Sequence, residues 1–282
     1  MGDFHWYPGH MAKAKRAIEE DLKLIDVIIE LTDARAPLSS GNPDIAAMAN
    51  GKGRMIVMSK SDLSEEKGNE SWMAYFKGKG LDTACVDLKS GAGMKKVRDL
   101  LAKAAERKHE RDKKRGIRLQ RPVRALVCGI PNVGKSTFIN SMAGKNIAKT
   151  GNRPGVTKGK QWIAVSKGIE LLDSPGLLWP KIGDERAAFN LALLGSMNDE
   201  VIDRERLTAG LIDIMKDRYP KALSDLYGVS GTDDTAAVLE KAAGSLNMIK
   251  KGGQPDTERA GQFLLDSFRC GKLGRITLEL PG

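Results

Sequence analysis

The chain has 282 residues, of which 41% are hydrophobic and 29% are charged, as is ordinary for a globular protein. It contains no run of about 18 apolar residues, so no membrane-spanning segment is predicted, and it opens without a secretory signal pattern. The formal net charge of +10 favours polyanionic partners such as nucleic acid. The three cysteines are scattered without metal-ligand spacing, so we expect a reducing, cytoplasmic environment.

The N-terminal stretch is aromatic and then basic. Residues 4–11 form an aromatic turn with Pro-Gly at its centre, and a helix is predicted over about 12–24. Its first turns carry Lys13, Lys15 and Arg16, which oppose the helix dipole, so helix stability does not explain them. They either serve an anionic partner or lie on a solvated face.

Predicted strands and helices alternate through the first half of the chain. The strands are apolar runs that end in polar turns, and they occupy residues 27–31, 54–58 and 83–86. The helices occupy about 65–79 and 94–110. This alternation predicts an α/β fold with a mostly parallel, doubly wound sheet. Ligands of such sheets bind at the carboxyl ends of the strands, where the polar turns lie.

Residues 129–137 read Gly-Ile-Pro-Asn-Val-Gly-Lys-Ser-Thr and lie between an apolar run, 123–128, and a predicted helix that includes 138–142. The pattern G-x-x-x-x-G-K-S between a strand and a helix is typical of a phosphate-binding loop. Backbone N–H groups of such a loop face one anion, and the helix N-terminus adds partial positive charge. A glycine-rich turn without a ligand is the alternative. The context predicts that the chain binds a nucleoside triphosphate.

Several residues of this loop are expected to bind the nucleotide. Lys135 would reach the β- and γ-phosphates and stabilise charge on the transferred phosphoryl group, which makes it a candidate catalytic residue. Ser136 would hold Mg²⁺, and Thr137 would lie near the α-phosphate. Further loop contacts are expected from Asn132, Val133 and Gly134.

Residues beyond the loop are expected to complete the metal site. Asp173 follows a predicted strand at 169–172 and would hold Mg²⁺ through water, and Thr157 would join it when the γ-phosphate is present. Gly176 would offer its backbone N–H to the γ-phosphate with no side chain in the way. Residues 153–155, Arg-Pro-Gly, suit a plain turn equally well.

Residues 59–62 suggest how the base is read. The carboxylate of Asp62 can accept hydrogen bonds from N1–H and the exocyclic amine of guanine, a donor pair that adenine lacks. The stem of Lys60 can lie along the base plane, with Ser59 and Ser61 as its neighbours. A helix N-cap at Ser61 or Asp62 is an alternative reading of these residues alone.

A second base-side element follows the third predicted strand. Asp87 and Leu88 begin the polar turn 87–93. The backbone of this turn is a candidate brace for the base, and an ordinary loop is the alternative.

The pattern changes from about Asp184. Before it, strands at 161–165 and 169–172 are joined by a hairpin signal, Ser-Lys-Gly. After it, apolar residues recur at helical spacing, in segments 186–197, 205–218, 233–248 and 258–269. We therefore expect an α/β domain over residues 1–184 and a smaller all-α domain over 185–282.

Together these motifs resemble those of the GTPase superfamily in rotated order, because the base-side elements precede the phosphate-side elements. Joining the usual termini and cutting after Gly176 produces this order, which is a circular permutation. Residues 6–13, Trp-Tyr-Pro-Gly-His-Met-Ala-Lys, the turn 33–37, Asp-Ala-Arg-Ala-Pro, and the stretch 173–176, Asp-Ser-Pro-Gly, strengthen the likeness. The chain resembles the bacterial circularly permuted GTPases that act in ribosome assembly.

The resemblance implies a GTPase that binds the maturing large (50S) ribosomal subunit and its rRNA, and leaves after hydrolysis. Ribosomal proteins are further possible partners, the chain is expected to act as a monomer, and the helical domain would contact RNA. A family potassium ligand maps onto Asn132, so K⁺ is expected to assist beside Mg²⁺ and GTP. The alternatives are a nucleotide-gated binding module with a protein partner and incidental hydrolysis, and an ATP-dependent RNA remodeller.

The chain departs from the motifs of its relatives at two positions. Ser59 stands where the family's base-side motif usually begins with Asn, which suggests weaker nucleotide affinity or looser guanine preference. Leu177 stands where many relatives carry a Gln that orients the attacking water, and an apolar side chain cannot do so. The resemblance offers His10 as the catalytic residue instead, and a plain turn role is the alternative.

The segment 107–124 is predicted to be a charge-dense link between the two halves of the sheet. Its cations suit rRNA phosphates, and such contacts weaken steeply with salt. A solvated helix and linker is the alternative.

Overall fold

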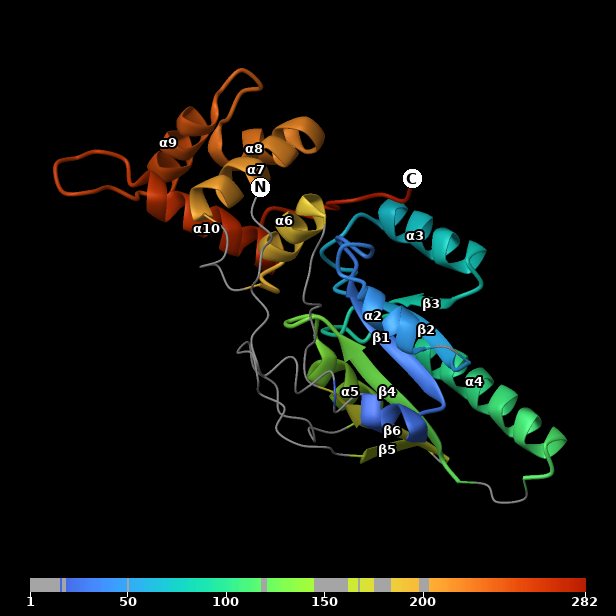
Figure 1. Ribbon diagram of the computed structural model, residues 1–282. Helices are drawn as coiled ribbons and strands as arrows, with labels where there is room; N and C mark the ends of the chain where they lie inside the picture. The colour runs from blue at the N-terminus through green and yellow to red at the C-terminus, as the bar shows by residue number, and fades with distance from the viewer. Residues whose placement is uncertain are drawn as a thin grey trace.

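The computed structural model describes Arg16 and residues 19–49, 51–117, 121–144, 162–166, 168–174, 184–197 and 203–282. Figure 1 shows a twisted sheet flanked by helices, with a group of helices from the C-terminal third gathered at one end of it. In the described residues, no helix is long and apolar enough to cross a membrane.

The sheet has six strands in the order β3-β2-β1-β4-β6-β5. They are β1 (Val27–Asp33), β2 (Gly53–Ser59), β3 (Asp82–Cys85), β4 (Val123–Gly129), β5 (Trp162–Ser166) and β6 (Ile169–Asp173). Every pairing is parallel except that of β5 with β6 at the edge. The predicted mostly parallel sheet is confirmed, and so is the hairpin that joins its last two strands.

Helices cover both faces of this sheet. They are α2 (Pro43–Met48), α3 (Glu66–Gly78), α4 (Met94–Lys114) and α5 (Lys135–Ala143), with a short 3-10 turn at Leu22–Leu24. Successive side chains of a strand point to opposite faces. In β1, Val27 and Ile29 therefore join the core under α4 and α5, whereas Ile28 joins the core under α2. The apolar runs are continuous because both faces are buried.

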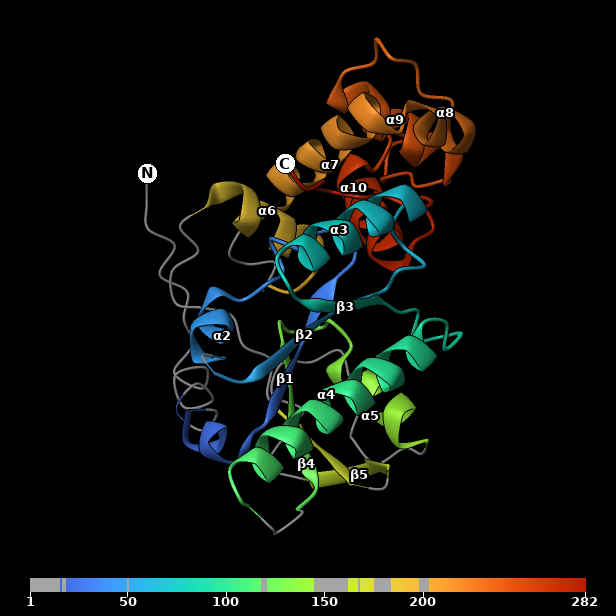
Figure 2. The ribbon, with the colours of Figure 1, turned by 90° about the vertical axis from the view of Figure 1, so that its right-hand side faces the viewer.

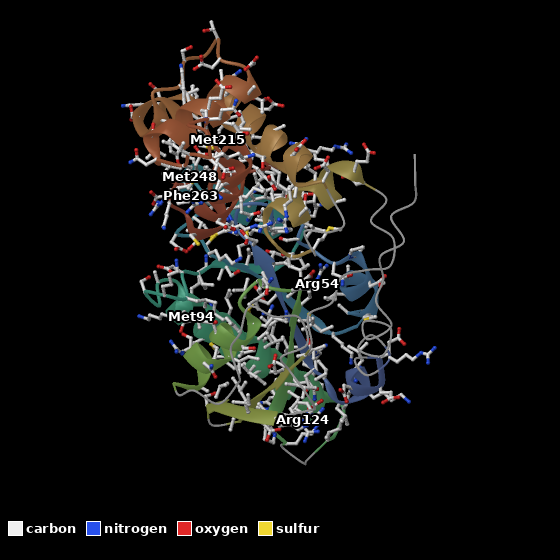
Figure 3. All side chains as sticks on the ribbon, turned by 90° about the vertical axis from the view of Figure 1, so that its left-hand side faces the viewer. Arg54, Met94, Arg124, Met215, Met248 and Phe263 are labelled. Carbon is white, nitrogen blue, oxygen red and sulfur yellow. The ribbon has the colours of Figure 1, made fainter. Side chains whose placement is uncertain are left out.

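The remaining helices form a second core. They are α6 (Glu185–Leu193), α7 (Arg204–Arg218), α8 (Pro220–Tyr227), α9 (Thr235–Ser245) and α10 (Thr257–Cys270). We call α7 to α10 the helical group. Figure 3 shows Met215, Met248 and Phe263 within it, and these side chains belong to one apolar cluster. Helix α6 contributes to both this cluster and the sheet core, so the domain division at 184/185 stays a prediction.

The last residues of the chain return from the helical group to the sheet domain. The amide of Ile276 donates to the carbonyl of Leu63, at 2.9 Å, and the amide of Leu278 donates to the carbonyl of Arg35, at 2.8 Å. These contacts place the C-terminal segment against the loops that follow β1 and β2.

The helices differ from those predicted in two respects, and one predicted helix is only partly described. The helix predicted over 94–110 extends to Lys114, so the first part of the predicted link 107–124 is helical, because its charged residues continue the exposed face of α4. Helices α2 and α8 were not predicted, since six and eight residues are too few to show a clear periodicity. Of the predicted N-terminal helix, Arg16 and residues 19–21 are helical, and the rest of 12–18 lies outside the described residues.

Candidate functional site

The carboxyl ends of the five parallel strands meet at one edge of the sheet. Strands β1 and β4 are neighbours in its middle, and the chain winds outward from them, to β2 and β3 on one side and to β6 on the other. Figure 2 shows α4 and α5 together on one face of this sheet. Such a reversal of winding is a topological switch point, where open α/β sheets bind ligands.

The loop after β4 has the backbone that a phosphate cradle requires. A Cβ on Gly129 would lie 2.4 Å from the carbonyl oxygen of Leu31 on the neighbouring strand, so only glycine fits there. Asn132 and Gly134 have positive φ values of 59° and 99°. Gly134 is the N-cap of α5 and provides no capping side chain, so the first amides of α5 stay available to an anion.

Lys135 lies inside this loop. Its ammonium group donates to the carbonyls of Ile130 at 2.7 Å and Gly129 at 3.2 Å. Burial lowers the pKa of Lys135 to about 8, although the charge of Asp173 opposes this shift. A buried cation next to the uncapped N-terminus of α5 suits the negative charge of a di- or triphosphate.

Ser59 joins the base-side loop to the phosphate loop. Its fully buried hydroxyl lies 2.7 Å from the carbonyl oxygen of Val133 and 3.1 Å from that of Thr32, and it can donate to one of them at a time. The shorter contact links residues 74 positions apart in the chain. The hydroxyl therefore reaches the phosphate loop, although it is shorter than the Asn that the family resemblance leads one to expect.

Lys60 and Asp62 follow Ser59 at this edge. Lys60 has a left-handed backbone, with φ of 56°, and its ammonium group lies 3.0 Å from Asp33 at the end of β1. The partly exposed carboxylate of Asp62 lies 3.4 Å from the ammonium group of Lys89. The amide of Ser61 donates to the carbonyl of Val86, so its backbone belongs to the same edge.

The turn after β3 lies against the phosphate loop. Asp87 closes it, since its carboxylate accepts the amide of Lys89 at 2.8 Å and the hydroxyl of Ser90 at 2.5 Å. A Cβ on Gly134 would lie 3.1 Å from a methyl carbon of Leu88, so this leucine packs on the loop. The structure thus brings the two base-side turns and the phosphate loop together, and their roles toward a nucleotide stay predictions.

Two of the three predicted Mg²⁺ ligands are described. Asp173 lies buried at the end of β6, and Ser136 lies half-buried in the first turn of α5 beside the exposed Thr137. A hydroxyl and a carboxylate are oxygen donors of the kind that Mg²⁺ prefers. No group of three or more His, Cys, Asp or Glu residues in the described part could hold a metal ion. His10, Thr157 and Gly176 lie outside the described residues.

Asn132, the predicted potassium ligand, also touches the C-terminal part of the chain. Its side-chain amide donates to the carbonyl of Gly195, just after α6, at 2.8 Å. The amide oxygen is the atom that could bind a cation. Potassium binding at Asn132 stays a prediction.

One pair at this edge had no role assigned from the sequence. The buried Asp33 and Arg35 form an ion pair at 2.9 Å, directly beside Lys60. A carboxylate and a guanidinium two residues apart after a buried strand were a visible signal. From the sequence, the turn 33–37 supported only the family resemblance.

Comparison with known proteins identifies the family. Residues 124–244 match the family described as 50S ribosome-binding GTPase. The chain is 42% identical to the ribosome biogenesis GTPase A of Bacillus cereus, over 98% of this chain and 93% of the relative. It is 33% identical to the protein of that name from Thermotoga maritima, over 98% of this chain and 94% of the relative.

A solved structure agrees with these relatives. The crystal structure of GNP-bound YlqF from T. maritima matches with a TM-score of 0.66 at 30% identity, covering 95% of this chain and 98% of that one. The predicted fold and the predicted resemblance are confirmed. The chain belongs to the ribosome biogenesis GTPase A family and is a GTPase whose phosphate loop lies in a circularly permuted α/β domain.

Proposed function

We propose that the chain is an assembly factor that binds the maturing large (50S) ribosomal subunit and leaves it when GTP is hydrolysed. The contact that carries this proposal joins Ser59 of the base side to Val133 of the phosphate side. It suits a site that holds both ends of one guanine nucleotide. The names of the relatives, ribosome biogenesis GTPase A, support the assembly role.

On the phosphate side, Lys135 and the loop amides would stabilise the charge that spreads over the transferred phosphoryl group. Ser136, Thr157 and Asp173 would hold Mg²⁺, Asp173 through water, and Gly176 would donate to the γ-phosphate. Bound Mg²⁺ would neutralise charge on the phosphate oxygens. Asn132 would bind K⁺ through its amide oxygen, which faces no competition from the bond that its nitrogen makes to Gly195.

On the base side, Asp62 would accept two hydrogen bonds from guanine while Lys60 lies along the ring. Asp87 and Leu88 would hold the turn that braces the base. Because Ser59 replaces an asparagine, guanine preference is expected to be looser than in relatives that carry the amide. Binding of GTP and ATP to the wild type and to Ser59→Asn tests this, and equal discrimination by both would reject it.

The attacking water needs a group that can orient it by hydrogen bonding. We propose that His10 orients it, since imidazole can accept and donate near neutral pH. Turnover would then be low in the free protein and raised by the ribosomal particle. His10→Ala should lose that stimulated turnover and keep GTP binding, whereas unchanged turnover would exclude the role.

Contact with rRNA is proposed for the helical group and for the end of α4. Several cations of the segment 107–124 are already engaged, in pairs such as Arg107 with Asp82 and Arg121 with Asp26. Within the described part of this segment, four exposed cations have no ion pair, and they are Arg111, Lys113, Lys114 and Arg115. These four are the candidates for phosphate contacts, which would weaken as salt rises.

Co-sedimentation of the purified full chain with large subunits tests the proposal most broadly. We expect association with a non-hydrolysable GTP analogue, weaker association with GDP, and loss of this difference in Lys135→Ala. Equal association with the large subunit in the GTP analogue and in GDP would contradict release on hydrolysis. No association even at low salt would favour the alternative, a nucleotide-gated binding module with a protein partner.

A further inference from the structure

A buried ion-pair network connects the base-side lysine to the helical group. Its centre is Asp33, the last residue of β1, which lies opposite Ser59 in the register of the sheet. One carboxylate oxygen accepts the backbone amide of Arg35 at 3.1 Å and its Nε at 2.9 Å. The other accepts a terminal guanidinium nitrogen of Arg35 at 2.9 Å and lies 3.0 Å from Nζ of Lys60. The carboxylate thus holds both cations at once.

This carboxylate stays ionised. Burial alone would raise the pKa of Asp33, but the charges of Arg35 and Lys60 and their hydrogen bonds together lower it far below its ordinary value. Because the carboxylate is buried, removing either cation would leave it with one charged partner in place of two.

Lys60 has a conformation that needs such support. Its φ of 56° lies in the left-handed region, which costs a residue with a Cβ roughly 1 kcal/mol. Strained residues persist where their surroundings hold them, and they gather at functional sites. The pair with Asp33 holds the end of the side chain, and the amide of Leu63 donates to the Lys60 carbonyl at 2.9 Å. The stem is thereby fixed from both ends.

Arg35 links this pair to α10. The guanidinium, 1% exposed, donates to the carbonyl of Phe268 at 3.2 Å and lies 4.8 Å from the centre of that ring. The carbonyl of Arg35 accepts the amide of Leu278 in the C-terminal segment. Helix α10 shields the guanidinium from water. Without α10 the guanidinium would be solvated, and its ion pair with the carboxylate of Asp33 would weaken.

We propose that Asp33 is a positioning residue for Lys60 in nucleotide binding, and that Arg35 makes this positioning depend on the docking of α10. The inference rests on the proposed base-side role of Lys60. Docking of α10 favours the fixed lysine, so a nucleotide that needs this lysine must in turn stabilise the docking of α10. A network that served stability alone would have no such coupling.

The test measures binding of a fluorescent GDP analogue to the full chain, with unlabelled GDP and inorganic pyrophosphate as competitors. Pyrophosphate has no base, so it reports the phosphate side alone. We expect Lys60→Ala and Asp33→Asn each to weaken GDP binding by about tenfold, and Phe268→Leu to weaken it by about threefold, with pyrophosphate competition unchanged. Phe263→Leu is the matched control, because Phe263 lies on the same helix within the helical group (Figure 3), whereas the Arg35 guanidinium lies over the ring of Phe268. It should bind GDP as the wild type does.

The outcomes separate the inference from the proposed function. Unchanged GDP binding by Lys60→Ala would reject the base-side role itself. Weakening by Lys60→Ala with none by Asp33→Asn would overturn the inference alone, as would an equal loss of GDP and pyrophosphate binding by Asp33→Asn. If Asp33→Asn does not fold, Arg35→Lys and Phe268→Leu decide by the same comparison, since both keep the carboxylate.

Amide hydrogen exchange provides a second readout. In the wild type, GDP should slow exchange in the last turn of α10, around Phe268, and in Lys60→Ala it should not. If GDP leaves amide exchange around Phe268 unchanged in the wild type, the proposed coupling between nucleotide binding and the docking of α10 is overturned.

Discussion

The two halves of the nucleotide site are built in different ways. The centre of the phosphate side is a loop of nine consecutive residues, 129–137, whose backbone forms the proposed cradle between β4 and α5. The base side is assembled from residues after three different strands and is held by buried polar contacts, including Asp33 with Lys60 and Ser59 with Val133. The phosphate loop is therefore a local structure, whereas the base side depends on contacts between segments that lie far apart in the chain. Substitutions should affect the two halves in different ways.

The largest effect is expected where the phosphate loop touches β1. Gly129→Ala would place a Cβ 2.4 Å from the carbonyl oxygen of Leu31, so strand and loop must separate. We expect a loss of about 3 kcal/mol in the free energy of unfolding, measured by urea denaturation. Gly80→Ala is the control, because Gly80 also has a positive φ, of 73°, but no described atom lies within 4 Å of its added Cβ. It should lose only about 1 kcal/mol. Similar losses of stability in Gly129→Ala and Gly80→Ala would contradict a steric clash between the added Cβ and the carbonyl of Leu31.

Lys135→Ala should separate binding from stability. The expected loss of GTP affinity is about 100-fold, since a charge-assisted contact to phosphate is removed. Stability should not fall, because burial disfavours the ammonium group, as its lowered pKa indicates. Titration calorimetry and thermal melts measure the two effects, and Lys95→Ala, an exposed lysine on α4, is the control. A loss of affinity below tenfold would argue against a phosphate contact.

Ser59→Ala tests the junction between the halves. Removing the hydroxyl leaves the buried carbonyl of Val133 without this donor, so we expect GTP affinity to fall by about fivefold. Ser71→Ala removes a hydroxyl bonded to the backbone of α3 at its surface and should change nothing. Equal affinities of Ser59→Ala and the wild type would show that the phosphate loop needs no brace from β2.

The pH dependence of binding should come from the phosphate side. With a pKa of about 8, Lys135 loses its proton as pH rises through that value, whereas bound phosphate would keep it protonated. GTP affinity should therefore fall by roughly fourfold between about pH 6.5 and about pH 8.5. In the absence of nucleotide the sign for stability is opposite, because a lysine with a lowered folded pKa favours folding more as pH rises from about 8 toward its unfolded value. An affinity that is flat over this interval would mean that Lys135 stays charged without nucleotide.

The same contrast explains what could be predicted from the sequence. The phosphate loop was predictable because its function resides in backbone geometry, which glycine spacing and the flanking strand and helix reveal. Asp62 and Lys60 could be assigned a base-side role only because that loop is present, and this role stays a prediction. The role of Asp33 and Arg35 was not, because their partner Phe268 lies 233 positions from Arg35 and no local pattern connects them. The last turn of α4, 111–114, was missed because its charges resemble those of a linker.

The most direct test of the account is a competition titration of Asp62→Asn with GDP and xanthosine diphosphate. An asparagine can accept from N1–H and donate to the C2 carbonyl of xanthine, but it cannot accept both donors of guanine. We predict that GDP binding weakens by about thirtyfold, that xanthosine diphosphate binding strengthens, and that pyrophosphate binding is unchanged. If Asp62→Asn binds GDP as tightly as the wild type, residues near 62 and residues near 135 do not hold the same nucleotide.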